Sequence, residues 1–243
     1  MGMPNEPVPA WRAEFYAPVA SFRDPLFPGV SRCLPLPPPS TVRGLLAAAT
    51  GRPAEDLPLG IAAWSEGSGV DAETFHPIAA DGSNPAVAGR VRAVKGGMTI
   101  RDRPFLADVH LSVWLPGADG ERVATALRRP RWPLRLGRSQ DIVHLTTLRP
   151  VELMPAAEAV VGHALAPRGG HDVGEAFCHR MAASISADRL TTAWTDYLWC
   201  DVPPGRRPVR GAFRQTTQAG QARQTTRAAD GGWEGQAVWL LSP

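Results

Sequence analysis

Two segments far apart in the chain carry side chains suited to binding phosphates and bases. The first segment reads Ser21, Phe22 and Arg23, and the second reads Gly137, Arg138, Ser139 and Gln140. A guanidinium, a hydroxyl and an amide on one glycine turn match the phosphate contacts and base-edge hydrogen bonds by which proteins hold single-stranded RNA. The alternative is a structural loop in which the following residue, Asp141, pairs locally.

A third candidate lies at the start of an expected helix. Pro37 to Pro39 hold the chain extended, so Ser40 is expected to act as the N-cap of a helix over 41–50. Thr41 and Arg43 would then lie at the N-terminus, where free N–H groups and the helix dipole attract anions. A well-capped core helix, closed by Gly51, is the alternative reading.

Charge is unevenly distributed along the 243 residues. The formal net charge is +3, and 25 of the 26 basic residues are Arg. Residues 86–149 hold twelve cations against five acids, a net charge of +7, which leaves −4 for the rest. A basic middle on an acidic body favours a localised polyanion groove, although a solvated basic surface remains open. The planar guanidinium also favours bidentate contacts with phosphates and bases.

Much of this charge falls in a segment with few apolar residues, at about 84–104. Gly96 and Gly97 lie near its centre, and the pattern predicts a protruding hairpin. Its cations are expected to contact phosphates. They are Arg90, Arg92, Lys95, Arg101 and Arg103.

The remaining periodicity predicts an α+β fold of β-α-β-β-α-β order, which matches a ferredoxin-like sheet. The expected strands are 11–20, 57–65, 72–78, 105–115 and 141–147, with helices at 41–50 and at 119–127, the second capped by Asp119. Residues 1–150 would form this unit, and 151–243 a smaller β-rich part. There we expect strands at 159–165, 198–202 and 237–241, a helix at 173–184 and a flexible segment at 203–235.

Composition excludes several classes of protein. No apolar run approaches the length needed to cross a bilayer, and the N-terminus does not resemble a signal peptide. Three scattered cysteines, Cys33, Cys178 and Cys200, argue against disulfides and favour a reducing cytoplasm. No zinc spacing, phosphate-binding loop or paired-carboxylate motif occurs, so no metal or other cofactor is expected.

Taken in order, the motifs resemble the Cas-five family, of the RAMP superfamily, in type I CRISPR surveillance complexes. The matching residues are Ser21 to Arg23, the Pro-Pro-Ser and Gly-Leu-Leu of 38–46, the run at 103–109, and Leu136 to Asp141. They span about the first 150 residues, and the Ser-Phe-Arg opening is most similar to the type I-B group.

This resemblance implies an RRM-like palm with a hairpin thumb, here at about 84–104. It implies a non-catalytic subunit of an antiviral ribonucleoprotein that caps the 5′ handle of CRISPR RNA. The palm would dock the Cas-seven backbone and the Cas-eight large subunit, and the thumb would reach the duplex of guide and target DNA. RNA-binding residues would be those of the two segments, Ser40, Thr41, Arg43, the five hairpin cations and His144.

Two alternatives remain. One branch of the family resembles a metal-independent endoribonuclease that cuts repeat RNA with a tyrosine, a lysine and an adjacent histidine. This chain has Tyr16, Tyr197 and Lys95 but no Lys-His pair, which favours binding over cleavage. The other is a general single-stranded nucleic-acid binder outside CRISPR, against which the ordered motifs argue.

Overall fold

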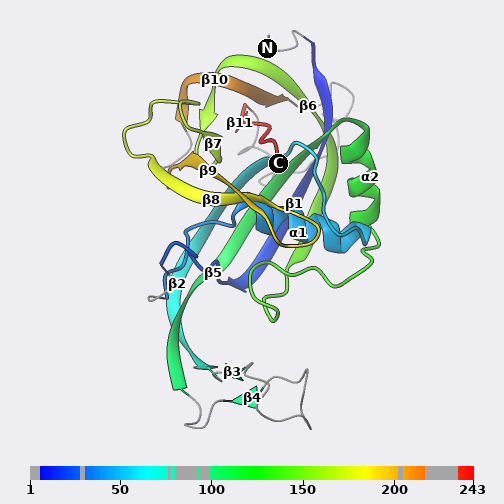
Figure 1. The fold of residues 1–243 in the computed structure, drawn as a ribbon. Coiled ribbons are helices and arrows are strands. Elements are labelled where there is room, and N and C mark those ends of the chain that lie inside the picture. Colours follow the sequence, from blue (N-terminus) through cyan, green and yellow to red (C-terminus); the bar gives the residue numbers. More distant parts are fainter. Residues whose placement is uncertain are drawn as a thin grey trace.

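The computed structural model describes residues 6–27, 31–75, 78–79, 92–93, 99–201, 205–216 and 235–243. Six strands form one antiparallel sheet in the order β11-β10-β6-β1-β5-β2 (Figure 1). Their bounds are β1 Val8–Ala20, β2 Gly60–Phe75, β5 Thr99–Pro116, β6 His144–Val161, β10 Gly205–Thr216 and β11 Ala237–Val238. The two helices are α1 Pro39–Thr50 and α2 Gly117–Leu127.

The predicted α+β, ferredoxin-like palm is confirmed. Strands β1, β2, β5 and β6 alternate with the helices as β-α-β-β-α-β, and they lie in the sheet as β6-β1-β5-β2. Alternating residues of β1 and β5, such as Phe15 and Leu111, are buried in the core, and α2 packs against both strands. Val123 and Leu127 present the apolar side of α2 to this core.

Helix α1 begins two residues earlier than a Ser40 cap would allow. Pro38 occupies the N-cap position without a side-chain hydrogen bond, and Pro39 is the first helical residue. A proline suits that position because its N–H would be unpaired there in any helix. The predicted cap at Asp119 is also wrong, since α2 starts at Gly117 after Pro116. The predicted left-handed Gly51 is confirmed, with φ of 76°.

The expected hairpin has longer arms than the sequence indicated. The predicted strands 57–65 and 72–78 merge in β2, which pairs with β5 from Gly60 opposite Trp114 to Phe75 opposite Thr99. Beyond them, β3 Ile78–Ala79 pairs with β4 Arg92–Ala93. The hairpin extends away from the sheet in Figure 1. Arg90 and Lys95 lie outside the described residues.

The C-terminal part adds strands to the sheet of the palm. The boundary expected at residue 150 falls inside β6, which pairs with β10 on the side opposite β1. A second sheet has the order β7-β9-β8, with β7 Ala166–Pro167, β8 Phe177–Ile185 and β9 Thr192–Trp199.

Two C-terminal predictions need correction. The helix expected at 173–184 is wrong, because β8 occupies most of that range and pairs with β9. A short apolar run does not distinguish a helix from a strand until its neighbours are known. The segment 203–235 was expected to be flexible, yet its residues 205–216 form β10 against β6. Within the described residues, no helix is long and apolar enough to cross a membrane.

Candidate nucleic-acid site at the base of the hairpin

The two polar segments lie against each other, although more than a hundred residues separate them. The backbone N–H of Ser21 donates to Asp141 Oδ2 at 3.0 Å. Gly137 has φ of 105°, and a Cβ built there would lie 2.7 Å from the carbonyl oxygen of Ser21. A side chain at 137 would therefore be strained and would also push the segments apart.

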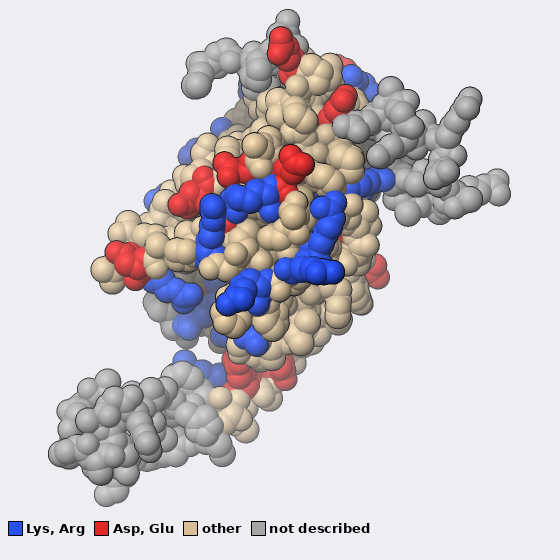
Figure 2. Space-filling model, turned by 90° about the vertical axis from the view of Figure 1, so that its right-hand side faces the viewer, with Lys and Arg blue, Asp and Glu red and all other residues tan. Residues whose placement is uncertain are grey.

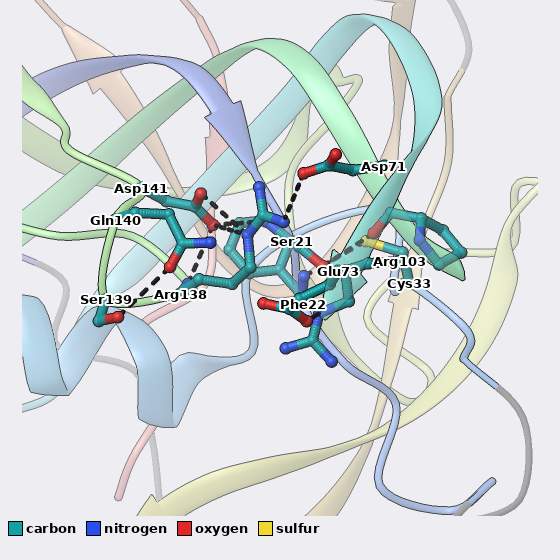
Figure 3. Close-up of polar contacts among 11 residues, drawn as sticks. Ser21, Phe22, Cys33, Asp71, Glu73, Arg103, Arg138, Ser139, Gln140 and Asp141 are labelled. Atoms are coloured by element: carbon teal, nitrogen blue, oxygen red, sulfur yellow. Dashed lines mark hydrogen bonds and ion pairs between the residues drawn. The ribbon is translucent and has the colours of Figure 1, made fainter. Parts of the chain in front are cut away.

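Arg138 holds this turn together from inside (Figure 3). Its side chain is only 8% exposed, and its Nε donates to Asp141 Oδ1 at 3.0 Å. The Arg138 backbone N–H also donates to Asp141 Oδ2 at 3.0 Å, and Nη1 lies 3.5 Å from Asp71 Oδ2 on β2. For Arg138 the geometry is that of the structural loop with local Asp141 pairing. Its guanidinium positions the turn and is largely inaccessible to a ligand.

The first segment, Ser21 to Arg23, likewise contains both buried and exposed side chains. Ser21 is buried and its hydroxyl donates to the carbonyl of Pro104 at 2.8 Å. Phe22 is buried, and its N–H donates to Cys33 Sγ at 3.3 Å. Burial raises the pKa of the Cys33 thiol, so it stays protonated at neutral pH. Of this segment, Arg23 alone has an exposed side chain.

The exposed end of the turn lines a groove of about 530 Å³ at the base of the hairpin. Its polar lining residues are Asp71, Arg138, Gln140, Asp141 and His144, of which Asp71, Gln140 and His144 are exposed. Its apolar walls come from β1, β5 and the segment before β6, through Pro18, Val19, Phe105 and Ile142. Ser139 is exposed next to Gln140, with its hydroxyl 3.3 Å from the amide oxygen. Apolar walls beside an amide and an imidazole suit a nucleobase, which needs both stacking and edge contacts.

Acids accompany the arginines on the hairpin arms. Arg103 lies opposite Asp71 in the strand register, and its Nε is 3.3 Å from Glu73 Oε2. Arg103 therefore forms an ion pair within the hairpin, and 25% of its side chain remains exposed to solvent. Arg101 is exposed near the outer end of β5. Arg92 lies on β4, and its side chain is outside the described part.

Arg43 does not belong to an anion site. It is 4% exposed, and its guanidinium donates to the carbonyls of Ala183, Glu55, Leu57 and Leu241. These bonds join α1 to β8, to the loop before β2 and to the C-terminal residues. Expecting it to contact RNA was wrong, because a guanidinium can satisfy backbone carbonyls as fully as phosphate oxygens.

Ser40 and Thr41 line a separate hollow of about 420 Å³, which also includes Arg135 and Gly137. The Thr41 N–H already donates to Pro38 O at 2.9 Å, and Pro39 has no N–H. The first turn therefore offers few free donors to an anion.

A cluster on the open face of the palm escaped the sequence reasoning. Tyr16 donates to the Asp108 carboxylate, and this hydrogen bond raises the pKa of the phenol. His110 stacks on Trp64 at 4.8 Å between ring centroids, and its Nε2 lies 3.2 Å from Glu66 Oε1. The strand register pairs Tyr16 with His110, so strand alternation was the signal that could have revealed the cluster. No group of three metal-ligating side chains occurs among the described residues.

Comparison with known proteins identifies the family. The family model described as CRISPR-associated protein (Cas_Cas5) matches residues 12–221. The chain belongs to the Cas-five family. No curated protein matches this Cas-five chain in sequence.

Two solved structures are similar to this Cas-five chain. One, described as "CRISPR RNA-guided surveillance complex", has 19% identity over 82% of this chain and 91% of that chain, with a TM-score of 0.53. Another, a CRISPR protein from Archaeoglobus fulgidus, has 12% identity over 97% and 100% of the two chains, with a TM-score of 0.47.

Proposed function

We propose that this Cas-five protein is the non-catalytic subunit that holds the repeat-derived 5′ handle of CRISPR RNA in a type I surveillance complex. The observation that carries this proposal is the groove at the hairpin base, built where the Ser21 segment meets the Gly137–Asp141 turn. A binding groove made by two distant segments exists only in the folded palm.

In the proposed complex, one handle base enters the groove between Phe105 and Ile142. The Gln140 amide and the His144 imidazole contact its edge, because an amide offers both a donor and an acceptor. Arg23 contacts the adjoining phosphate from the rim. Arg138 acts indirectly, since its bonds to Asp141 fix the turn that presents Gln140.

The partners proposed from the family are the Cas-seven backbone subunit, the Cas-eight large subunit and target DNA held through the guide duplex. One solved structure of the same fold is described as an RNA-guided surveillance complex, which supports such an assembly. A protruding hairpin whose described arms carry Arg92, Arg101 and Arg103 supports a thumb that reaches nucleic acid.

The proposed role is binding without cleavage. Tyr16 would need to lose its proton to act as a base, and its raised pKa opposes that at neutral pH. His110 is held by Trp64 and Glu66 on the open face of the palm. Incubating the purified chain with repeat RNA in EDTA tests this point. Intact RNA is expected, and a single specific cut would establish the endoribonuclease.

The direct test replaces the groove side chains. Gln140→Ala with His144→Ala should weaken handle retention by the reconstituted complex roughly tenfold or more, because each lost hydrogen bond is worth about 1 kcal/mol. Glu175→Ala with Arg180→Ala changes two exposed side chains on or beside β8 and serves as the control. Equal guide RNA content and equal handle release in both variants would contradict the assignment.

A further inference from the structure

Four exposed arginines gather on the face that carries α2, away from the groove at the hairpin base. The loop after α2 crosses the end of α1: the N–H of Arg131 donates to Ala49 O at 2.9 Å, and the N–H of Trp132 donates to Ala48 O at 3.0 Å. This crossing places the loop beside the C-terminal end of α1, where Arg52 follows Gly51. We call this set the α1–α2 patch, and its residues are Arg52, Arg128, Arg129, Arg131 and Trp132.

Gly51 makes the crossing possible. A Cβ at residue 51 would lie 2.9 Å from Arg131 Cγ, and the residue has φ of 76°. The glycine that ends α1 therefore also lets the stem of Arg131 lie flat against the helix end. Figure 2 shows basic side chains around an uncharged area on this face.

The patch arginines are exposed, and in the part of the chain that the structure describes no ion pair within 4.0 Å joins any of the four to an acid. Arg52 interacts electrostatically with the buried acid Glu55, but both Glu55 oxygens already accept hydrogen bonds from Arg122, at 3.0 and 2.7 Å. Arg122 also forms an ion pair with Asp119 at 3.3 Å. Positive charges gathered in one area repel one another, and a polyanion relieves that repulsion.

An exposed indole lies within the patch. Trp132 is 58% exposed, and the Arg131 guanidinium lies 5.6 Å from its ring centroid. Arg128 lies over Trp11 at 4.9 Å, which anchors that arginine to the palm. An exposed aromatic ring in a basic area matches the way single-stranded nucleic acid is held, with phosphates on cations and a base on the ring. A duplex keeps its bases stacked inside and cannot use the indole in this way.

We infer that the α1–α2 patch is a second nucleic-acid site, which binds a single strand through phosphate contacts and stacking on Trp132. This site is separate from the groove that contains Gln140 and His144. A strand of either RNA or DNA has the required chemistry, so the test includes both.

The test uses the full chain and two labelled 15-nucleotide probes without handle sequence, oligo(U) and oligo(dT), across a salt series. Arg52→Ala, Arg128→Ala and Arg129→Ala together should flatten the slope of log affinity against log salt by about 2. Trp132→Ala should weaken binding of the tighter probe about 5- to 150-fold, since stacking contributes about 1–3 kcal/mol per base. Whichever probe binds more tightly identifies RNA or DNA as the source of the strand.

The matched control removes three exposed arginines elsewhere, through Arg168→Ala, Arg206→Ala and Arg207→Ala. It should leave the salt slope and affinity near those of the parent, and unfolding curves should show that all variants fold. An equal loss of affinity in the control would show that net charge alone explains the effect, and it would overturn the inference. So would an unchanged Trp132→Ala affinity, or displacement of the probe by polyglutamate as readily as by an unlabelled strand. The Gln140→Ala and His144→Ala variant should bind these probes normally, which separates this site from the handle groove.

Discussion

Arg138 and Gln140 lie in the same turn, but one side chain is buried and the other is exposed. Arg138 is buried against Asp141 and Asp71, whereas Gln140 is exposed in the groove. An arginine in a glycine turn suggests a phosphate contact from sequence alone. In the structure that guanidinium donates to the buried Asp141 carboxylate, whereas the Gln140 amide and His144 are exposed in the groove.

The first prediction follows from this division. Arg138→Ala leaves the Asp141 carboxylate, itself only 3% exposed, without its charged partner. Such a loss costs about 3–5 kcal/mol. Gln140→Ala, at an exposed site, should change stability by less than ~0.5 kcal/mol. Urea unfolding of both variants measures the difference, and equal stabilities would contradict the positioning role of Arg138.

A second residue-level prediction concerns Gly137. Gly137→Ala forces a Cβ to within 2.7 Å of the Ser21 carbonyl at a positive φ, so the turn and the Ser21 segment must separate. We expect a loss of roughly 1–3 kcal/mol and weaker handle binding. Gly174→Ala, where nothing lies within 4 Å, is the control. A Gly137→Ala protein as stable as the parent would mean that the two segments are not tightly joined.

Among the elements, α1 is tied to the rest of the fold by one side chain. Arg43 reaches carbonyls in β8, in the loop before β2 and near the C-terminus. Arg43→Lys keeps the charge but offers one nitrogen in place of three, so it should still destabilise the protein by about 1–3 kcal/mol. Arg52→Ala is the exposed arginine control. Thermal unfolding decides the point, and a Lys variant with the melting temperature of the parent would contradict it.

The elements show how far sequence reasoning reaches. Strong alternation in 105–115 and the apolar spacing of 41–50 were sufficient to predict β5 and α1, because both patterns match a buried face. The helix predicted at 173–184 does not form, because pairing of β8 with β9 outweighs a weak helical spacing. Residues 205–216 look polar, yet pairing with β6 orders them as β10.

The site was predictable only in part, for a related reason. The sequence located the Ser21 and Gly137 segments, and the fold brings them together. It could not show which side chains point inward, so Arg43 and Arg138 appeared equivalent to exposed arginines. The groove walls come from β1, β5 and the segment before β6, and only the tertiary register combines them.

For the whole molecule, three histidines that are partly or fully buried predict a pH dependence of stability. Burial lowers the pKa of His163, His171 and His179. In the unfolded chain they take up protons near pH 6.5. Their contribution is therefore fully present above about pH 6.5 and is lost as the pH falls below it, because the unfolded state then binds more protons. Urea unfolding at pH 7.5, 6.5 and 5.5 should show that the free energy of unfolding decreases as the pH is lowered.

His171 allows a specific check of this trend. Its Nδ1 accepts the Val173 N–H at 3.3 Å, and its ring lies 5.6 Å from Trp239 between centroids. Asn can accept the same hydrogen bond without titrating, so His171→Asn should reduce the slope between pH 7.5 and 5.5. His144→Asn, at an exposed position, is the control. A parent protein equally stable at all three pH values would contradict the prediction.

The central claim is that the groove at the hairpin base holds the 5′ handle. Photocrosslinking within the reconstituted complex tests it most directly, with a benzoyl-phenylalanine placed at exposed Ile142 and a second at exposed Glu175 as the control. The account predicts that position 142 crosslinks to handle nucleotides of the guide RNA and that position 175 does not. Crosslinks from position 142 to spacer nucleotides alone, or to no RNA in a complex that contains the guide, would contradict it.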